Sequence, residues 1–202
     1  MGYSKYKNIK SVIKKFGLES DFLSIFPEIE PMPISPWLAE SLAIAKMLPL
    51  TNEKTKSERL VSPILLDVVR HFTRRLCLFS GEDLSVLPED DLSGECDFFF
   101  SLHPPKPYID CPIISLVEAK NEDMELGLGQ CAAQVYGAHL YNKNEGKDVP
   151  VLYGCTTTGK DWQFFRFENG IFYVHHEEMT DLPQVLGTWH WILNYYVTNF
   201  SK

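Results

Sequence analysis

The sequence predicts an α/β fold in which a mixed central sheet is flanked by helices and is preceded by a helical extension. Two short apolar runs rich in β-branched and aromatic residues, 94–102 and 112–120, lie on either side of a proline-rich segment. Apolar residues at helical spacing then mark 124–141. A strand, a break, a second strand and a helix in this order indicate a hairpin within a sheet that a helix covers.

The chain of 202 residues is long enough for one domain with a substantial core. We expect a single domain over 1–202, with 1–50 as the helical extension and 51–202 as the core. No apolar run approaches the length of a membrane span, and the N-terminus lacks the apolar centre of a signal peptide. The five cysteines show no Cys-x-x-Cys pair, so we expect reduced thiols and a cytoplasmic protein.

The extension, 4–48, is predicted to consist of helical segments separated by prolines. Ser35 and Pro36 suit a helix start, because serine caps a helix and proline fits its first position. The lysines of 5–15 have no acidic residue among them. Two interpretations stay open: the extension covers one edge of the sheet, or it forms a basic arm that faces a substrate.

The first half of the core is predicted to hold a long helix and a strand. Thr51 to Phe72 carries apolar residues at helical spacing, and Pro63 inside it should kink the helix or begin a new first turn. We expect 76–79 to be a strand, followed by a turn at 80–83.

The hairpin brings together the residues that can carry chemistry. Asp97 and Glu118 lie about equally far from the hairpin tip, so they should be neighbours across the two strands. Glu118 and Lys120 share a face, because side chains alternate along a strand. Two acids and a lysine at one end of two strands could hold a hard divalent cation and activate water. The alternative is a buried ion-pair cluster without a metal.

The rest of the chain completes the sheet. The helix at 124–141 carries Gln130, and 149–156 reads as a buried strand. The turn signal Glu168-Asn169-Gly170 predicts a further hairpin of 162–167 with 171–174. A closing helix at 182–196 is rich in Trp and Tyr, which we assign to the core or to a dimer surface, so a homodimer stays open.

Asp97, then Glu118-Ala119-Lys120, then a helix with Gln130 resembles the PD-(D/E)XK nuclease superfamily, over roughly residues 53–165. Cys96 stands where the motif name has proline. The helix also departs from the subset with a Gln-x-x-x-Tyr pattern, because Gln134 occupies the fourth position after Gln130 and the nearest tyrosine is Tyr136.

The resemblance implies a restriction-endonuclease-like fold and a phosphodiesterase that depends on Mg²⁺ or Mn²⁺. Asp97, Glu118 and the Ala119 carbonyl would hold the metal, and Lys120 would orient the water or stabilise the phosphoryl oxygens. Gln130 would position that lysine or contact a phosphate. A glutamate of the first core helix would complete the site, with Glu58 as first choice and Glu53 as second. Glu95 is the alternative ligand if the strand register differs.

The expected partner is a nucleic acid, with DNA as the substrate that the resemblance implies, and no membrane. The formal charge of −8 argues against a typical nucleic-acid binder, which is basic. The competing hypothesis is therefore a catalytically inactive protein of the same fold that serves as a binding or scaffolding module. The choice between endonuclease and exonuclease stays open.

Overall fold

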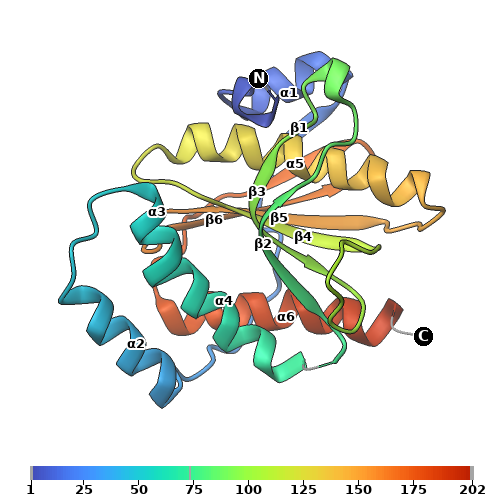
Figure 1. The fold of residues 1–202 in the computed structure, drawn as a ribbon. Coiled ribbons are helices and arrows are strands. Elements are labelled where there is room, and N and C mark those ends of the chain that lie inside the picture. Colours follow the sequence, from blue (N-terminus) through green and yellow to red (C-terminus); the bar gives the residue numbers. More distant parts are fainter. Residues whose placement is uncertain (1, 73, 201–202) are drawn as a thin grey trace.

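The computed structural model describes residues 2–72 and 74–200, so Met1, Thr73, Ser201 and Lys202 lie outside it. Within this part, a seven-stranded sheet lies between two layers of helices, with the strand order β1-β7-β6-β5-β4-β3-β2 (Figure 1). Parallel and antiparallel pairs both occur. The predicted α/β class, with a mixed sheet flanked by helices, is confirmed.

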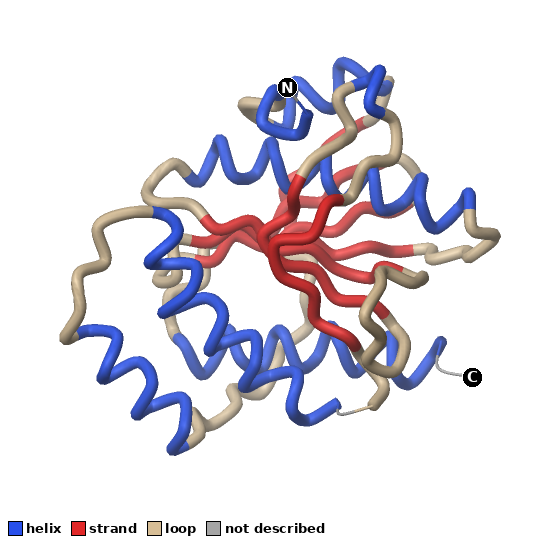
Figure 2. The backbone as a smooth tube through the Cα atoms, in the orientation of Figure 1, coloured by secondary structure: helices blue, strands red, loops and turns tan. Residues whose placement is uncertain are grey.

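The strands in chain order are β1 (Glu19–Leu23), β2 (Cys77–Asp83), β3 (Glu95–Ser101), β4 (Ile113–Ala119), β5 (Val151–Thr157), β6 (Trp162–Glu168) and β7 (Ile171–His175). Figure 2 shows them as one continuous twisted layer. Both predicted hairpins are present, because β3 pairs antiparallel with β4, and β6 pairs antiparallel with β7.

The main helices are α1 (Ile9–Phe16), α2 (Pro36–Lys46), α3 (Glu53–Lys56), α4 (Ser62–Val69), α5 (Met124–Asn144) and α6 (Leu182–Phe200). A π-helical turn (Ser57–Val61) joins α3 to α4, and short 3₁₀ turns lie at Gly2–Lys5, Arg70–Phe72 and Pro88–Asp90. In Figure 1, α5 covers one face of the sheet with α1 outside it, while α4 and α6 cover the other face.

The N-terminal segment is not helical throughout, as the sequence predicts for 4–48. Residues 19–23 form the edge strand β1, which pairs parallel with β7 from Glu19 opposite Ile171 onward. Four of its five residues are exposed, so the strand has no alternating apolar pattern that the sequence could display. Its hydrogen bonds to β7 stabilise it instead.

The predicted turn at Ser80–Asp83 is also wrong. β2 continues to Asp83, and its pairing with β3 places Ser80 opposite Phe98 and Glu82 opposite Cys96. Gly81 adopts a positive φ of 67°, a conformation that favours glycine and that makes the segment look like a turn from sequence. The sheet pairing on both sides of Gly81 outweighs that local signal.

Pro63 lies in a new first turn of the helix of the first half, one of the two outcomes predicted from the sequence. The chain stays helical from Glu53 through Val69, and Pro63 lies in the first turn of α4, after the π-helical turn. A π-helical turn widens the helix by about one residue, so it rotates the faces of α3 and α4 relative to each other.

The core between sheet and helices is largely aromatic. Trp189 of α6 is fully buried and packs against Phe164 and Phe100, with ring centroids 5.2 and 5.5 Å apart. Tyr196 is also fully buried and donates a hydrogen bond to the Val151 carbonyl at 2.6 Å. These two aromatics therefore belong to the core, one of the two assignments that the sequence allows. None of the helices in the described part is long and apolar enough to cross a membrane.

Candidate active site

The candidate site is centred on an ion pair between Glu118 and Lys120, two positions apart at the end of β4. The Lys120 Nζ atom lies 2.8 Å from Glu118 Oε1, and the two side chains are 8 % and 7 % exposed. Alternation along the strand brings both side chains to one face, as the sequence predicts. The backbone N–H of Lys120 donates to the Thr157 carbonyl at 2.7 Å, which ties the end of β4 to β5.

Asp97 joins this pair from the adjacent strand. The antiparallel register places Phe98 opposite Val117, so the next position brings Asp97 beside Glu118. Asp97 Oδ2 accepts the backbone N–H of Ala119 at 2.7 Å. The structure thus shows the amide of Ala119, and not its carbonyl, in contact with the predicted metal ligand.

The glutamate that reaches the site from the first core helix is Glu53. Its Oε1 atom lies 3.3 Å from Lys120 Nζ, whereas Glu58 pairs with Lys54 at 3.8 Å and its side chain is 60 % exposed. Glu58 lies in the π-helical turn that follows α3, so the regular α-helical spacing from Glu53 does not apply to it. The order of choice predicted from sequence is therefore reversed for contact with Lys120.

The glutamine that contacts the site is Gln134, not Gln130. Gln134 Nε2 donates a hydrogen bond of 2.7 Å to Glu118 Oε2, the oxygen that Lys120 leaves free. Gln130 lies one turn earlier on the same helix, is buried, and its Oε1 atom has no hydrogen-bond partner in the described structure. The sequence signal for Gln134 was its four-residue spacing from Gln130, which puts both on one face of α5.

Helix α5 can hold Gln134 over the sheet because small residues let it approach closely. The Asp123 side chain caps its first turn by accepting the N–H of Leu126 at 2.8 Å. A Cβ atom at Gly127 would collide with Thr156 Oγ1 and would lie 2.7 Å from Lys120 Cγ. Gly127 is therefore the position at which the helix crosses directly over the lysine.

Burial and charge together set the protonation of the site. Burial, followed by the nearby Asp97, raises the pKa of Glu118, and burial also raises the pKa of Asp97. Burial acts to lower the pKa of Lys120, but the carboxylates of Glu118 and Glu53 outweigh it and the pKa lies above its usual value. Lys120 is therefore a charged ammonium at neutral pH.

An open groove gives solvent access to the acidic side of the site. Its volume is about 360 Å³, and four carboxylates line it, those of Glu53, Glu58, Glu95 and Asp97. Glu58 and Glu95 thus face the same groove as Asp97, although the structure shows neither in contact with Lys120.

The donor set fits a hard divalent cation. Mg²⁺ prefers oxygen ligands and usually takes only one or two carboxylates from a protein. Asp97 and Glu118 supply that number. In the described residues no three Asp, Glu, His or Cys side chains form a complete ligand set, so the remaining positions would fall to water and substrate. Three carboxylates around one ammonium also leave negative charge that a cation would neutralise.

The thiols and histidines add no further ligands here. All five cysteines are free. Cys96 and Cys131 lie in the sheet and in α5, and burial raises the pKa of both thiols, so neither is a reactive thiolate. His175, at the end of β7, is buried and accepts the N–H of Ile25 at Nδ1 (3.3 Å).

Comparison of the sequence with protein-family models finds no matching family, and comparison with curated proteins finds no relative.

Proposed function

We propose that this chain is a phosphodiesterase of the PD-(D/E)XK superfamily, with a restriction-endonuclease-like fold, that cleaves DNA with the help of Mg²⁺ or Mn²⁺. The observation that carries the proposal is the junction of Asp97, Glu118 and Lys120 at the ends of two antiparallel strands. The ion pair at 2.8 Å and the hydrogen bond from Ala119 to Asp97 at 2.7 Å support it.

In this proposal each side chain has a distinct role. Asp97 and Glu118 hold the metal, which would activate a water and neutralise phosphoryl charge. Because Lys120 is charged, it acts as an electrostatic stabiliser of the phosphoryl oxygens and not as a base. Gln134 fixes the orientation of Glu118 through its hydrogen bond, so it is a positioning residue.

A scaffolding protein of the same fold remains the second candidate, and one observation favours it. Both oxygens of Glu118 already have partners, Lys120 and Gln134, so this carboxylate is satisfied without a ligand. The net charge of −8 points the same way, because a protein that binds DNA over a wide surface is usually basic.

The two candidates are separated by cleavage and by metal binding. Plasmid DNA, branched DNA and RNA are incubated with Mg²⁺ or Mn²⁺ and with wild type, Asp97→Asn or Lys120→Ala. Asp148→Asn, an exposed acid near the far end of α5, is the control. We expect Asp97→Asn and Lys120→Ala to lose turnover by orders of magnitude, whereas the control keeps it. Circular dichroism shows whether each variant is folded at the assay temperature.

Titration calorimetry with Mn²⁺ completes the test. Asp97→Asn should bind Mn²⁺ more weakly than wild type, while Lys120→Ala retains both carboxylates and should still bind. If the protein cleaves RNA but not DNA, the proposed substrate changes from DNA to RNA. If wild type cuts none of the substrates and Asp97→Asn binds Mn²⁺ as well as wild type does, the nuclease proposal is wrong.

A further inference from the structure

A second groove, lined mostly by aliphatic side chains, lies between α2, α4 and the connection from β5 to β6. Its volume is about 340 Å³, a size typical of small-molecule sites. Leu42, Leu60 and Ile64 form its walls together with the almost fully buried Trp162. Ile64 and Trp162 are almost fully buried, whereas Leu42 and Leu60 are half-buried and leave part of the apolar wall in contact with water.

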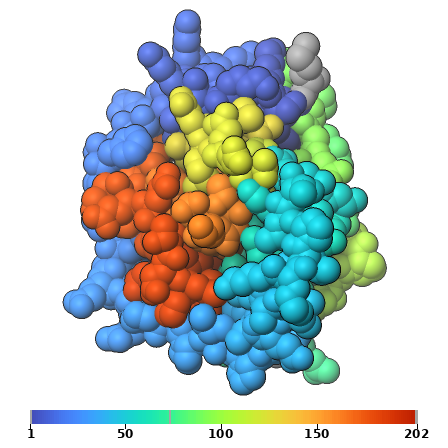
Figure 3. Space-filling model, turned by 90° about the vertical axis from the view of Figure 1, so that its left-hand side faces the viewer, coloured from blue at the N-terminus to red at the C-terminus, as the bar shows by residue number. Residues whose placement is uncertain are grey.

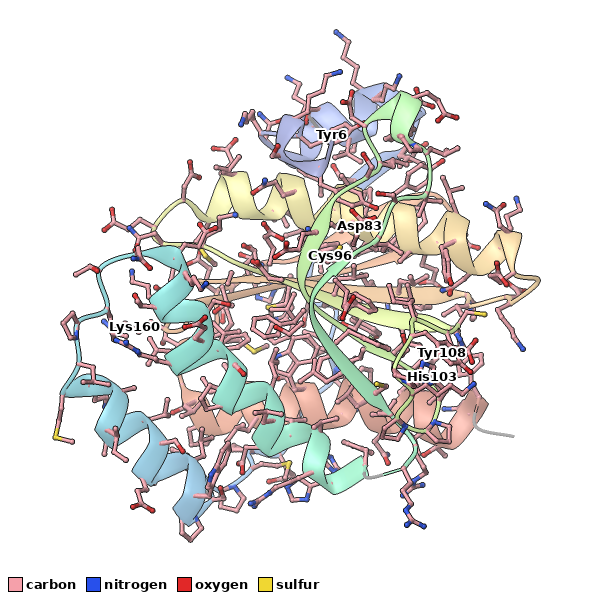
Figure 4. All side chains as sticks on the ribbon, viewed as in Figure 1. Tyr6, Asp83, Cys96, His103, Tyr108 and Lys160 are labelled. Carbon is pink, nitrogen blue, oxygen red and sulfur yellow. The ribbon has the colours of Figure 1, made fainter. Side chains whose placement is uncertain are left out.

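Two cations stand at the rim of this apolar groove. Lys46 ends α2, and Lys160 lies in the loop between β5 and β6; both are exposed. In residues 2–72 and 74–200, neither lysine forms an ion pair with a carboxylate. Figure 4 places Lys160 on the side of the molecule where α2 leads into α3. The groove thus combines an apolar interior with unpaired positive charge at its rim.

The apolar groove continues toward the candidate active site. A neighbouring hollow of about 320 Å³ shares Leu50, Leu60 and Lys160 with it and extends to Lys56 and Asn121. Lys56 Nζ donates a 2.7 Å hydrogen bond to the carbonyl of Asn121, the residue directly after Lys120. In Figure 3 the segment around residue 160, in orange, lies between α3 in cyan and the start of α5 in yellow.

We propose that the apolar groove binds an unpaired nucleotide of the DNA strand, so that the substrate is single-stranded or locally opened DNA. The base would occupy the aliphatic interior, and the phosphates beside it would contact Lys46 and Lys160. This inference rests on the nuclease function proposed above. It extends that function by assigning the class of substrate and the side from which the strand approaches.

Charge and shape select this occupant. Nonspecific single-strand binding combines a cationic track for the backbone with side chains, mostly aromatic, against which the bases pack. In this groove aliphatic walls would take that role. A base within a duplex is stacked and paired, and it reaches such a pocket only after it leaves the stack. The connecting hollow also contains Glu122 and Asp161. We therefore assign the phosphate contacts to the apolar end, where Lys46 and Lys160 stand.

Binding without cleavage tests the proposal. Fluorescein-labelled single-stranded DNA and a duplex of the same length are titrated in EDTA, and fluorescence anisotropy is recorded. Wild type should bind the single strand more tightly than the duplex. The double variant Lys46→Glu/Lys160→Glu should lose about tenfold or more in single-strand affinity, because it reverses two phosphate contacts. Lys147→Glu, an exposed lysine just after α5, is the matched control and should bind as wild type does.

A second variant probes the interior of the groove. Leu42→Glu places a carboxylate in the aliphatic interior, where it would repel the strand, so single-strand binding should weaken by about tenfold. Circular dichroism confirms that this variant is folded.

The outcomes separate this inference from the function on which it rests. If wild type cleaves DNA but both groove variants bind the single strand as wild type does, the groove assignment is overturned and the nuclease proposal stands. If wild type cuts nothing while both variants weaken single-strand binding, the groove assignment stands and the catalytic proposal falls. A groove that takes up a fluorescent fatty acid but no DNA also overturns the assignment.

Discussion

The buried ion pair of Lys120 and Glu118 allows a prediction of stability that does not depend on metal or substrate. Lys120→Met removes the ammonium but keeps most of the aliphatic stem that packs beneath Gly127. Glu118, which is 5 % exposed and whose pKa burial raises to about 7, would then either keep an unpaired carboxylate beside Gln134 or take up a proton. Leaving one partner of a buried pair uncompensated costs about 3–5 kcal/mol.

The second carboxylate partner changes this figure little. Glu53 is 47 % exposed and lies 3.3 Å from Lys120, so its pair with the lysine contributes at most about 1 kcal/mol. We therefore expect Lys120→Met to lower the free energy of unfolding by about 3–5 kcal/mol. In the double variant Glu118→Gln/Lys120→Met both charges are gone, and much of that loss should be recovered.

Urea unfolding, followed by tryptophan fluorescence and by circular dichroism in EDTA, measures these values. The two single variants and the double variant form a cycle that isolates the coupling between Lys120 and Glu118. A loss of less than about 1 kcal/mol for Lys120→Met would show that the pair is not buried as the structure has it. A double variant less stable than Lys120→Met would refute the reasoning about an uncompensated carboxylate.

Three further predictions concern the elements around the site. Gly127→Ala should destabilise the protein by about 1–3 kcal/mol in thermal unfolding, because the new methyl group would collide with Thr156 and Lys120. The control is Gly146→Asn, which should change stability little, because Gly146 has a positive φ that asparagine tolerates and open space around it. Asn142→Leu should cost about 2–4 kcal/mol in urea unfolding, because the buried amide exchanges hydrogen bonds of 2.8 and 2.7 Å with the backbone of Ile113; unchanged stability would contradict this. Burial lowers the pKa of His139, which lies against Phe167, so the unfolded chain takes up the proton first and the free energy of unfolding falls as pH drops below about 6.5. His139→Phe should flatten this pH dependence of stability. An identical dependence in both proteins would show that His139 does not contribute.

The hairpin of β3 and β4 shows what the sequence alone determines. Two apolar runs separated by prolines predict two strands with an irregular connection, as the structure has them. Because side chains alternate along a strand, Glu118 and Lys120 then lie on the same face. The helix α5 and the second hairpin follow from equally local signals, a helical spacing and an Asn-Gly turn. Local chemistry is sufficient wherever one segment carries its own pattern.

Only the tertiary structure decides which side chains complete the site. Gln130 and Gln134 lie on one face of α5, and the distance at which Gly127 lets the helix cross the sheet places Gln134, not Gln130, against Glu118. The choice of Glu53 over Glu58 depends on how α3 docks beside Lys120. Strand β1 exists only through its pairing with β7, since its own residues are mostly exposed. These features arise from contacts between distant segments, which no local pattern records, because a sequence pattern reports periodicity and not the packing of one element on another.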